Sequence, residues 1–306
     1  FNQCLSTWAE KTSDDVDTKK MLKGSGCPNR KNPDATNGPW CQDYKQGCVA
    51  LSAPTRTPTV PGTPTGTPTG TPTSTPTSTP TDSDSLNCNS FCSGDRPDVS
   101  SFVTDDYSFQ KLIRNCYNYY SCPLDSKDIS CWNTAGITDM AYAFAKGSFS
   151  NSNSGPIGSL SFYFNDPLKC WDVGQVTSMK QMFSLSYFNE SIGNWNTSQV
   201  ENMDGMFYRA KFNKPIDSWD VSQVKTTARM FRKAYGYFNQ PIDSWNVSQV
   251  TSMKQMFNLA SLFDQPIASW DVSQVKDMTR MFYLAEYFNQ SLRDWNTSQV
   301  KYMNGM

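Results

Sequence analysis

One phrase recurs through the second half of this chain. From Ser244 the sequence reads SWNVSQVTSMKQMF, and close variants precede and follow it, NWNTSQVENMDGMF from Asn194 and SWDVSQVKDMTRMF from Ser269. The tryptophans of successive copies lie 24 to 26 residues apart between Trp171 and Trp295, a period in the range of leucine-rich repeats. A unit this short cannot bury an apolar face alone, so the units must stack on one another.

Each unit carries two apolar patterns in succession. The first has the offsets of a leucine-rich repeat and the alternation of a short strand; in one unit its members are Ile242, Trp245, Val247 and Val250. The second recurs every three or four residues, as on one face of a helix; its members there are Met253, Met256, Phe257 and Ala260. A binding groove could use the same Met and Phe side chains, but their helical spacing favours a core.

These patterns predict the α/β class: a right-handed, leucine-rich-repeat-like solenoid with one strand and one helix in each repeat. The repeats occupy residues 129–306, and their tryptophan column, Trp132 to Trp295, is expected in the core. The last repeat stops at Met306, where a phenylalanine is expected next, so we expect the protein to continue. Ahead of the repeats, apolar residues on one helical face predict a capping helix near residues 105–120: Phe109, Leu112, Ile113 and Cys116.

The recurring phrase resembles the BspA-like surface-protein repeats, which are relatives of leucine-rich repeats. The resemblance is carried by WDVSQVKDMTRMF, WNVSQVTSMKQMF and their variants, preceded by YSFQKLIRNC and CWNTAGITDMAYAF. It covers roughly residues 104–306. It implies a repeat fold and a protein of the cell surface, often an adhesion protein, and it implies no catalytic residues.

The cysteines indicate an oxidising compartment. There are ten, an even number, and the chain begins at Phe1 without a signal-peptide pattern, as a mature secreted chain would. Metal thiolate sites are the alternative, but their CxxC pairs are absent. We expect a Cys131–Cys170 disulfide, because equivalent atoms of neighbouring coils lie about 4.8 Å apart. The pairing of the others is left open: Cys4, Cys27, Cys41, Cys48, Cys88, Cys92, Cys116 and Cys122.

Residues 54–81 are rich in threonine and proline, with a Gly/Ser-Thr-Pro-Thr tetrad from Gly62. Such frequent proline excludes helix and sheet and favours polyproline II. Threonine beside proline is typical of O-glycosylated stalks, and a bare flexible linker is the alternative. We expect sugars on Thr57, Thr59, Thr63, Thr65, Thr67, Thr69, Thr71, Thr73, Thr75, Thr77, Thr79 and Thr81. The stalk, residues 54–85, would join a small disulfide-rich module, 1–53, to a disulfide-bearing cap, 86–128, that precedes the repeats.

The residue after each repeat tryptophan alternates strictly between Asn and Asp, from Asn133 to Asn296. It should face solvent, and interposed Asn would separate carboxylates that otherwise stack about 4.8 Å apart. N-x-S/T sequons begin at this position and in the preceding turn: Asn196, Asn246 and Asn296, and Asn189 and Asn289. Unused sequons are the alternative, but their recurrence at one repeat position favours N-glycosylation. A parallel column, Gln175 to Gln299, predicts a ladder of side-chain amides.

Composition excludes several functional classes. The chain has no histidine, which removes Ser-His-Asp catalysis and histidine metal sites. The net charge of −1 does not indicate nucleic-acid binding, and no apolar run approaches the ~20 residues of a transmembrane helix. We therefore expect no enzyme, no cofactor, no metal site and no membrane span in this segment.

The sequence thus predicts a structural, self-assembling glycoprotein that is extracellular or on the cell surface, as a component of a fibre or surface layer. Its partners would be further copies of itself and covalent glycans. The alternative is an adhesin or receptor-like binding module that uses the solenoid surface. Glycans on alternate coils would obstruct a protein ligand on that face, which favours the structural role.

Overall fold

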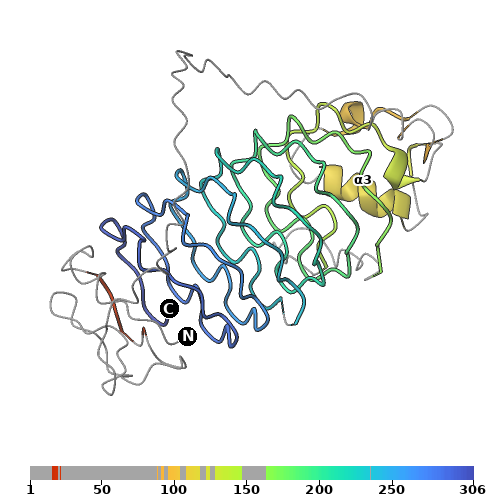
Figure 1. Ribbon diagram of the computed structural model, residues 1–306. Helices are drawn as coiled ribbons and strands as arrows, with labels where there is room; N and C mark the ends of the chain where they lie inside the picture. The colour runs from red at the N-terminus through yellow and green to blue at the C-terminus, as the bar shows by residue number, and fades with distance from the viewer. Residues whose placement is uncertain are drawn as a thin grey trace, which may run out of the picture.

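In the computed structural model, residues 16–19, 21, 88, 91–92, 96–103, 108–117, 122–124, 128–146, 163–234 and 236–306 are described. From residue 128 onward the chain winds in successive coils that lie side by side along one axis (Figure 1). Parallel backbone bridges join neighbouring coils at one residue each: Asp139, Ser178, Asn202, Thr226, Ser252, Asp277 and Tyr302. The repeats therefore stack, as their short length requires.

The expected α/β solenoid with one strand and one helix per repeat is wrong. In the described stretches of residues 132–146 and 163–306, the backbone forms turns and single-residue bridges, with neither a helix nor a strand. The apolar spacing correctly predicted which side chains are buried. The backbone that buries them is a series of turns and bridges rather than a strand and a helix.

The methionine-phenylalanine half of each coil shows why the helix prediction failed. In the coil from Met253, every second amide donates to a carbonyl of the next coil, as from Met253 to Asp277 (2.9 Å) and from Phe257 to Met281 (2.9 Å). The amides between them close turns on the third residue back, as from Met256 to Met253 (3.1 Å). An α-helix needs bonds to the fourth residue back, so this half is a chain of turns cross-linked between coils.

Left-handed backbone makes these turns possible. In the same coil, Gln255 (φ 58°) and Leu259 (φ 60°) each occupy the third place of a turn, where a type II turn needs positive φ. Glycine takes the equivalent place at Gly205 and Gly305. A larger residue in this region costs about 1–2 kcal/mol, which the hydrogen bonds between coils must offset.

The tryptophan half of each coil is joined to its neighbours mainly by side chains. Each indole N–H from the second coil onward donates to a backbone carbonyl one coil earlier, as from Trp245 to Ile216 (2.9 Å) and from Trp270 to Ile242 (3.0 Å). The hydroxyl of the serine before the tryptophan does the same in three coils, as from Ser244 to Asp217 (2.8 Å). The hydroxyls of Thr134 and Thr197 instead donate to the following coil. Trp132, in the first coil, has a buried indole N–H without a hydrogen-bond partner, because no repeat precedes it to supply the carbonyl.

The tryptophan column lies in the core, as predicted. From Trp132 to Trp295 each ring is at most 4% exposed, and Trp245 is 3% exposed. Three neighbouring pairs of these rings stack with centroids 6.4 Å apart: Trp195 with Trp219, Trp245 with Trp270, and Trp270 with Trp295. The Met and Phe side chains of the second pattern are buried beside them, with Met256 and Phe257 fully covered, so the core interpretation of that stripe is confirmed.

The first coils are covered by helix α3, Ser108–Tyr117, together with the short 3₁₀ turns η1, Ser100–Phe102, and η2, Ile129–Cys131. The predicted capping helix is therefore confirmed, and the apolar face predicted for it is buried: Phe109, Leu112, Ile113 and Cys116. Phe109 packs edge-on against Trp171 (5.7 Å between centroids), and Gln110 donates to the carbonyl of Tyr142 (2.7 Å).

Three disulfides hold this end together, and the predicted Cys131–Cys170 bond is wrong. The bonds are Cys88–Cys170, Cys92–Cys131 and Cys116–Cys122. The amide of Cys92 donates to the carbonyl of Cys88 (2.8 Å), so these two lie on one face of a helical turn, about 6 Å apart along its axis. That rise is close to the ~4.8 Å between coils, so each cysteine of the turn meets the cysteine of a different coil.

At the opposite end, a segment from near the N-terminus lies on the last coil. Asp17 forms a parallel bridge with Tyr302, and Val16 and Met21 are buried in the same core as the repeats. We call this segment, residues 16–19 and 21, the terminal rung. In the described ranges, no helix is both long and apolar enough to cross a bilayer.

Candidate functional site: the asparagine and aspartate column

The residue that follows each repeat tryptophan is held by one local hydrogen bond. Its Oδ1 accepts from the amide two residues later, as in Asp172 with Gly174 (2.9 Å) and Asn246 with Ser248 (3.2 Å). The remaining members do the same: Asn133, Asn196, Asp220, Asp271 and Asn296. This is an Asx turn. Asn and Asp both supply Oδ1, which explains why these two residue types alone alternate here.

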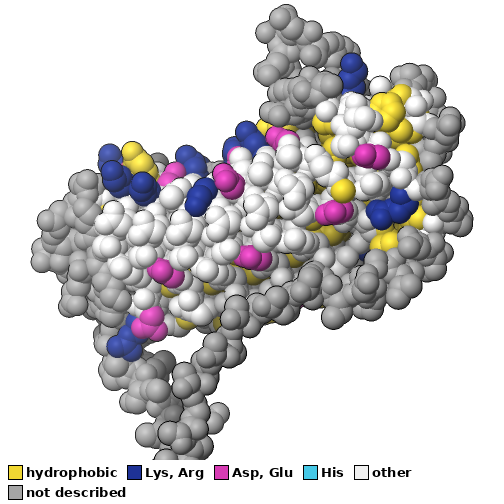
Figure 2. Space-filling model, turned by 90° about the horizontal axis from the view of Figure 1, so that it is seen from above, with side chains coloured by type: hydrophobic (Ala, Val, Ile, Leu, Met, Phe, Trp, Pro, Cys, Tyr) yellow, Lys and Arg dark blue, Asp and Glu magenta, His cyan; other side chains and the backbone are white. Residues whose placement is uncertain are grey.

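The column is exposed from Asp172 onward, so it forms an accessible row along the stack. One face of the molecule is shown in Figure 2, where the backbone and side chains that are neither hydrophobic nor charged (white) predominate and single acidic side chains are spaced along the coils. The prediction that this position faces solvent is confirmed, although it lies in a turn rather than on a strand.

The asparagines of the column are chemically suited to carry a sugar. An N-linked glycan attaches to Nδ2 of a sequon asparagine. At Asn196 and Asn246 the turn is held through Oδ1, so modification at Nδ2 leaves that hydrogen bond in place. The hydroxyl-bearing residues of these sequons, Ser198 and Ser248, are half-buried, and Ser298 of the third is exposed.

The two remaining sequons lie in a second ladder that the sequence did not reveal. The amide of each residue in this ladder donates to Oδ1 of its counterpart one coil earlier, as from Asn213 to Asn189 (2.8 Å) and from Asn289 to Asp264 (2.9 Å). The ladder runs through Asn165, Asn189, Asn213, Asn239, Asp264 and Asn289. Its signal in the sequence was the Asn or Asp that follows a phenylalanine in each repeat.

The glutamine prediction placed an amide ladder in the wrong column. The column from Gln175 to Gln299 is exposed, and Gln249 accepts from Lys225 Nζ (3.2 Å). Glutamine amides instead bond along the axis beside the asparagine ladder, as from Gln240 Nε2 to Asn213 Oδ1 (3.0 Å). Gln265 and Gln290 make equivalent bonds.

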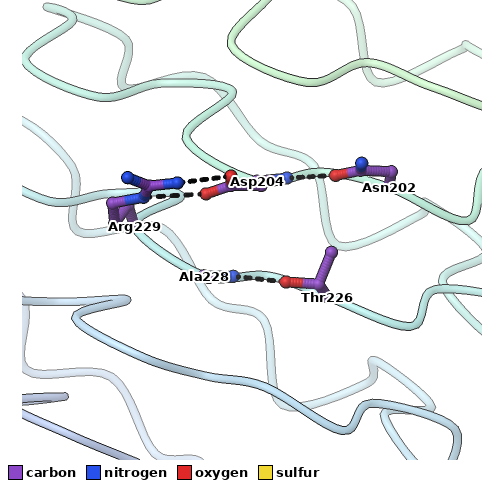
Figure 3. Close-up of polar contacts among 5 residues, drawn as sticks. All are labelled: Asn202, Asp204, Thr226, Ala228 and Arg229. Atoms are coloured by element: carbon purple, nitrogen blue, oxygen red, sulfur yellow. Dashed lines mark hydrogen bonds and ion pairs between the residues drawn. The ribbon is translucent and has the colours of Figure 1, made fainter.

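Two ion pairs link neighbouring coils on the methionine side among the described residues: Lys254 with Asp277 (3.8 Å), and the closer pair of Asp204 and Arg229, which is drawn in Figure 3. Arg229 donates from Nε and Nη2 to the two carboxylate oxygens of Asp204, at 3.0 and 2.6 Å. The hydrogen bond that Arg229 donates to Asp204 raises the pKa of Arg229 further above its ordinary value. Asn202 and Thr226 accept from the amides two residues later in their own coils, at 2.9 and 3.2 Å. These local hydrogen bonds hold the backbone turns that carry Asp204 and Arg229.

Two groups of predicted sites lie outside the described residues. These are the stalk threonines, from Thr57 to Thr81, and the cysteines Cys4, Cys27, Cys41 and Cys48. Within the described ranges, no three acidic or cysteine side chains converge as a metal site would require. The described site is therefore a regular array of exposed amides and carboxylates.

A family comparison covers the repeats. The family described as "Mycoplasma protein of unknown function, DUF285" matches residues 104–159, 154–248 and 235–306. Together these ranges span two thirds of the chain, so the chain belongs to this family. Comparisons with curated proteins and with solved structures each found no match.

Proposed function

We propose that this protein is a structural, self-assembling glycoprotein of the extracellular space or the cell surface, as a component of a fibre or surface layer. The observation that carries the proposal is the exposed column in which sequon asparagines occupy every second coil from Asn196 to Asn296. The Asx turn holds every member in the same geometry, so glycans would project from one face in a fixed register.

The spacing of the sequons favours a regular glycan coat. Neighbouring coils lie about 4.8 Å apart, so sequons on alternate coils are about 9.6 Å apart. Asp220 and Asp271 occupy the coils between them and keep the same turn without carrying a sequon. This arrangement gives each glycan lateral room that a sugar on every coil would lack.

The disulfides support the proposed extracellular location. Bonds such as Cys88–Cys170 and Cys92–Cys131 persist in oxidising environments and are rare in the cytosol. The resemblance to BspA-like surface repeats agrees with an extracellular position and is part of this proposal. The predicted O-glycosylated stalk would extend the same coat ahead of the repeats.

An adhesin or receptor-like role is the second candidate, and one observation favours it. Exposed tyrosines precede the buried phenylalanine of several coils: Tyr163, Tyr187, Tyr237 and Tyr287. Exposed aromatic side chains are common at binding surfaces. In part of this row, however, the rings already contact each other or Lys211, whose Nζ lies 4.1 Å from the Tyr187 ring centroid.

The mass of the native secreted protein tests the proposal. An amidase that removes N-glycans converts each carrier asparagine to aspartate, so peptide mapping should show this conversion at Asn196, Asn246 and Asn296. Ser248→Ala removes one sequon while it keeps Asn246 and its turn, and it should remove one glycan mass only. Native protein that carries no glycan at the column, or that sediments as a monomer at every concentration, would refute the structural role.

A further inference from the structure

Four cationic side chains gather on two neighbouring coils in the middle of the stack. Arg209 and Lys233 occupy equivalent places, each two residues after a buried phenylalanine and each with left-handed backbone, at φ 55° and 60°. The amide of Arg209 donates to the carbonyl of Arg232 (3.0 Å), so the two coils are joined at this point. We call these side chains, together with Lys211, the basic cluster: Arg209, Lys211, Arg232 and Lys233.

No acidic side chain of the described residues pairs with the basic cluster. The two ion pairs in that part of the chain involve other cations. The contacts of the cluster are with uncharged groups instead. Lys211 Nζ lies 4.1 Å from the Tyr187 ring centroid, and the Arg232 guanidinium lies 5.4 Å from that of Tyr208. Arg232 Nε also donates a long hydrogen bond to Asn258 Oδ1 (3.4 Å), so the positive charge of the cluster is not balanced by carboxylates in contact with it.

The stacking of these cations contrasts with the Asn/Asp column, where an asparagine separates one carboxylate from the next. In the basic cluster, Arg209 and Lys233 project from backbones about 4.8 Å apart, and like charges at such a distance repel by about 1 kcal/mol in water. The left-handed backbone does not require a cation, since Leu185 and Leu259 occupy the same place in the coils on either side. An anionic ligand would remove this repulsion, so the cluster is suited to bind one.

Exposed aromatic rings flank the basic cluster. Lys211 occupies the place in its coil that Tyr187 and Tyr237 occupy in the coils before and after it, next to the buried phenylalanine. Its Nζ lies 4.1 and 5.7 Å from the two ring centroids, and both tyrosines are exposed. The cluster and the two rings therefore form one continuous surface. The face of an aromatic ring packs well against the C–H face of a sugar ring, and the phenol group exchanges hydrogen bonds with sugar hydroxyls.

We propose that the basic cluster binds an acidic polysaccharide, whose carboxylate or sulfate groups pair with the cations while its sugar rings pack on Tyr187 and Tyr237. A guanidinium presents two parallel N–H donors that match the paired oxygens of a carboxylate, and sulfate presents oxygens of the same kind. Since equivalent places recur along the axis, an extended polymer that lies along the stack contacts several of these side chains at once. The inference goes beyond the proposed structural function and does not depend on self-assembly.

Titration of the secreted protein with polymers of defined charge tests the class of ligand. The probes are polygalacturonate, dextran sulfate, neutral dextran and polyglutamate, followed by calorimetry. We expect both acidic polysaccharides to bind, with an affinity that falls as salt is raised, and neutral dextran not to bind. If neither acidic polysaccharide binds at about 0.15 M salt, the inference is refuted. If polyglutamate binds as tightly as they do, the surface accepts any polyanion and the assignment to a polysaccharide is wrong.

A pair of charge variants locates the binding surface. Arg209→Gln/Lys233→Gln removes the stacked cations and should weaken binding of the acidic polysaccharides by about tenfold or more. The fold should tolerate this change, because other coils carry leucine at the equivalent place. The matched control, Lys225→Gln/Lys276→Gln, removes the same charge from two exposed lysines outside the cluster and should change the affinity by less than about twofold. Equal losses in the two variants would show that net charge alone drives binding and would refute the site.

An aromatic variant tests the contact with the sugar rings. Tyr187→Ala/Tyr237→Ala should weaken binding of polygalacturonate by about fivefold and leave any binding of polyglutamate unchanged. No loss, or the same loss for both polymers, would show that the rings do not pack on sugar. Sedimentation of the same variants keeps this inference apart from the proposed function. A protein that assembles but binds no acidic polysaccharide refutes the inference alone, whereas a monomer that binds through the cluster supports it while the structural role fails.

Discussion

The first coil and the last coil are covered in different ways. At the first, helix α3 lays an apolar face over the stack, and Cys88–Cys170 and Cys92–Cys131 fix the preceding segment covalently. At the last, the terminal rung adds two backbone hydrogen bonds with the last coil and the side chains of Val16 and Met21. The first coil is therefore covered by a segment that disulfides hold in place. The last coil is covered by a segment that is held by noncovalent contacts alone.

The largest loss of stability is expected from a substitution in the middle of the stack, and the effects at the two ends are compared with it. Trp245→Ala removes a buried ring from the middle of the stack and the indole bond to Ile216, and it should lower the free energy of unfolding by about 3–5 kcal/mol. Chemical denaturation followed by tryptophan fluorescence measures this. Trp245→Phe keeps much of the ring, so it should cost less; equal losses would mean that the ring does not pack as described.

The covalent end should show the next largest effect. Replacing both Cys88 and Cys170 by serine should cost about 2–4 kcal/mol, because the unfolded chain loses a long closed loop. Removing Cys116–Cys122, which closes a loop with a sequence separation of only 6, should cost less. Thermal unfolding of the two double variants compares them directly, and a larger loss from the short loop would contradict this account.

The rung should show a smaller effect that stays local. Met21→Ala should cost less than about 2 kcal/mol, because the rung can detach without leaving a cavity in the core. Hydrogen exchange should accelerate at the amide of Met303, which donates to Asp17, and not at the amide of Met253 in mid-stack. Faster exchange at both would show that the rung supports the whole stack.

The Asp204–Arg229 pair offers a still smaller effect away from either end. Its arginine side chain is 42% exposed, so Arg229→Gln should cost at most about 1 kcal/mol, and the loss should shrink in high salt. Glutamine already occupies the equivalent left-handed position at Gln181 and Gln255, so the backbone is not newly strained. A double-mutant cycle with Asp204→Asn isolates the pair energy.

The smallest effect is a pH dependence confined to the first end. The amide of Ser100 donates to Asp98 Oδ1 (2.9 Å), and this bond holds the pKa of Asp98 below its ordinary value of 3.8. A carboxyl with a lowered folded-state pKa stabilises the fold above its ordinary pKa, and this contribution is lost as pH falls through the folded value. The protection of the Ser100 amide, its exchange rate relative to the intrinsic rate at the same pH, should therefore fall below about pH 4. Asp98→Asn keeps the acceptor and should make that protection insensitive to pH over the same range.

Sequence reasoning identified what is buried more reliably than how the backbone runs. The tryptophan column, the Met and Phe core, and the capping helix followed from apolar spacing, because burial acts on side chains directly. The helix and strand of each repeat were wrong because positive φ at residues such as Gln255 and Leu259 leaves no mark in the apolar pattern. The Cys131–Cys170 pairing failed because the segment at Cys88 and Cys92 offered each coil its own partner.

The candidate site was predicted in part. The exposed Asn/Asp column was found from its alternation, but its turn was not, because an Asx turn is a local bond that charge spacing does not report. The second ladder, which includes Asn189 and Asn289, was missed as a ladder, because its bonds join a side-chain oxygen to a backbone amide one coil away and so leave no apolar period in the sequence. The terminal rung was missed because one matching segment far from the repeats has no period to reveal it.

The indole bonds give the stack a direction. Each tryptophan from Trp171 onward donates to the coil before it, whereas the alternate amides that begin at the first methionine of a coil, such as those of Met253 and Phe257, donate to the coil after it. Reversing the axis would exchange donors for acceptors, so two such stacks cannot meet end to end with the same faces. A filament that the proposed assembly built along this axis would be polar, with the capped first coil of every unit pointing the same way. Its two ends would accept new subunits at different rates, as in other polar polymers.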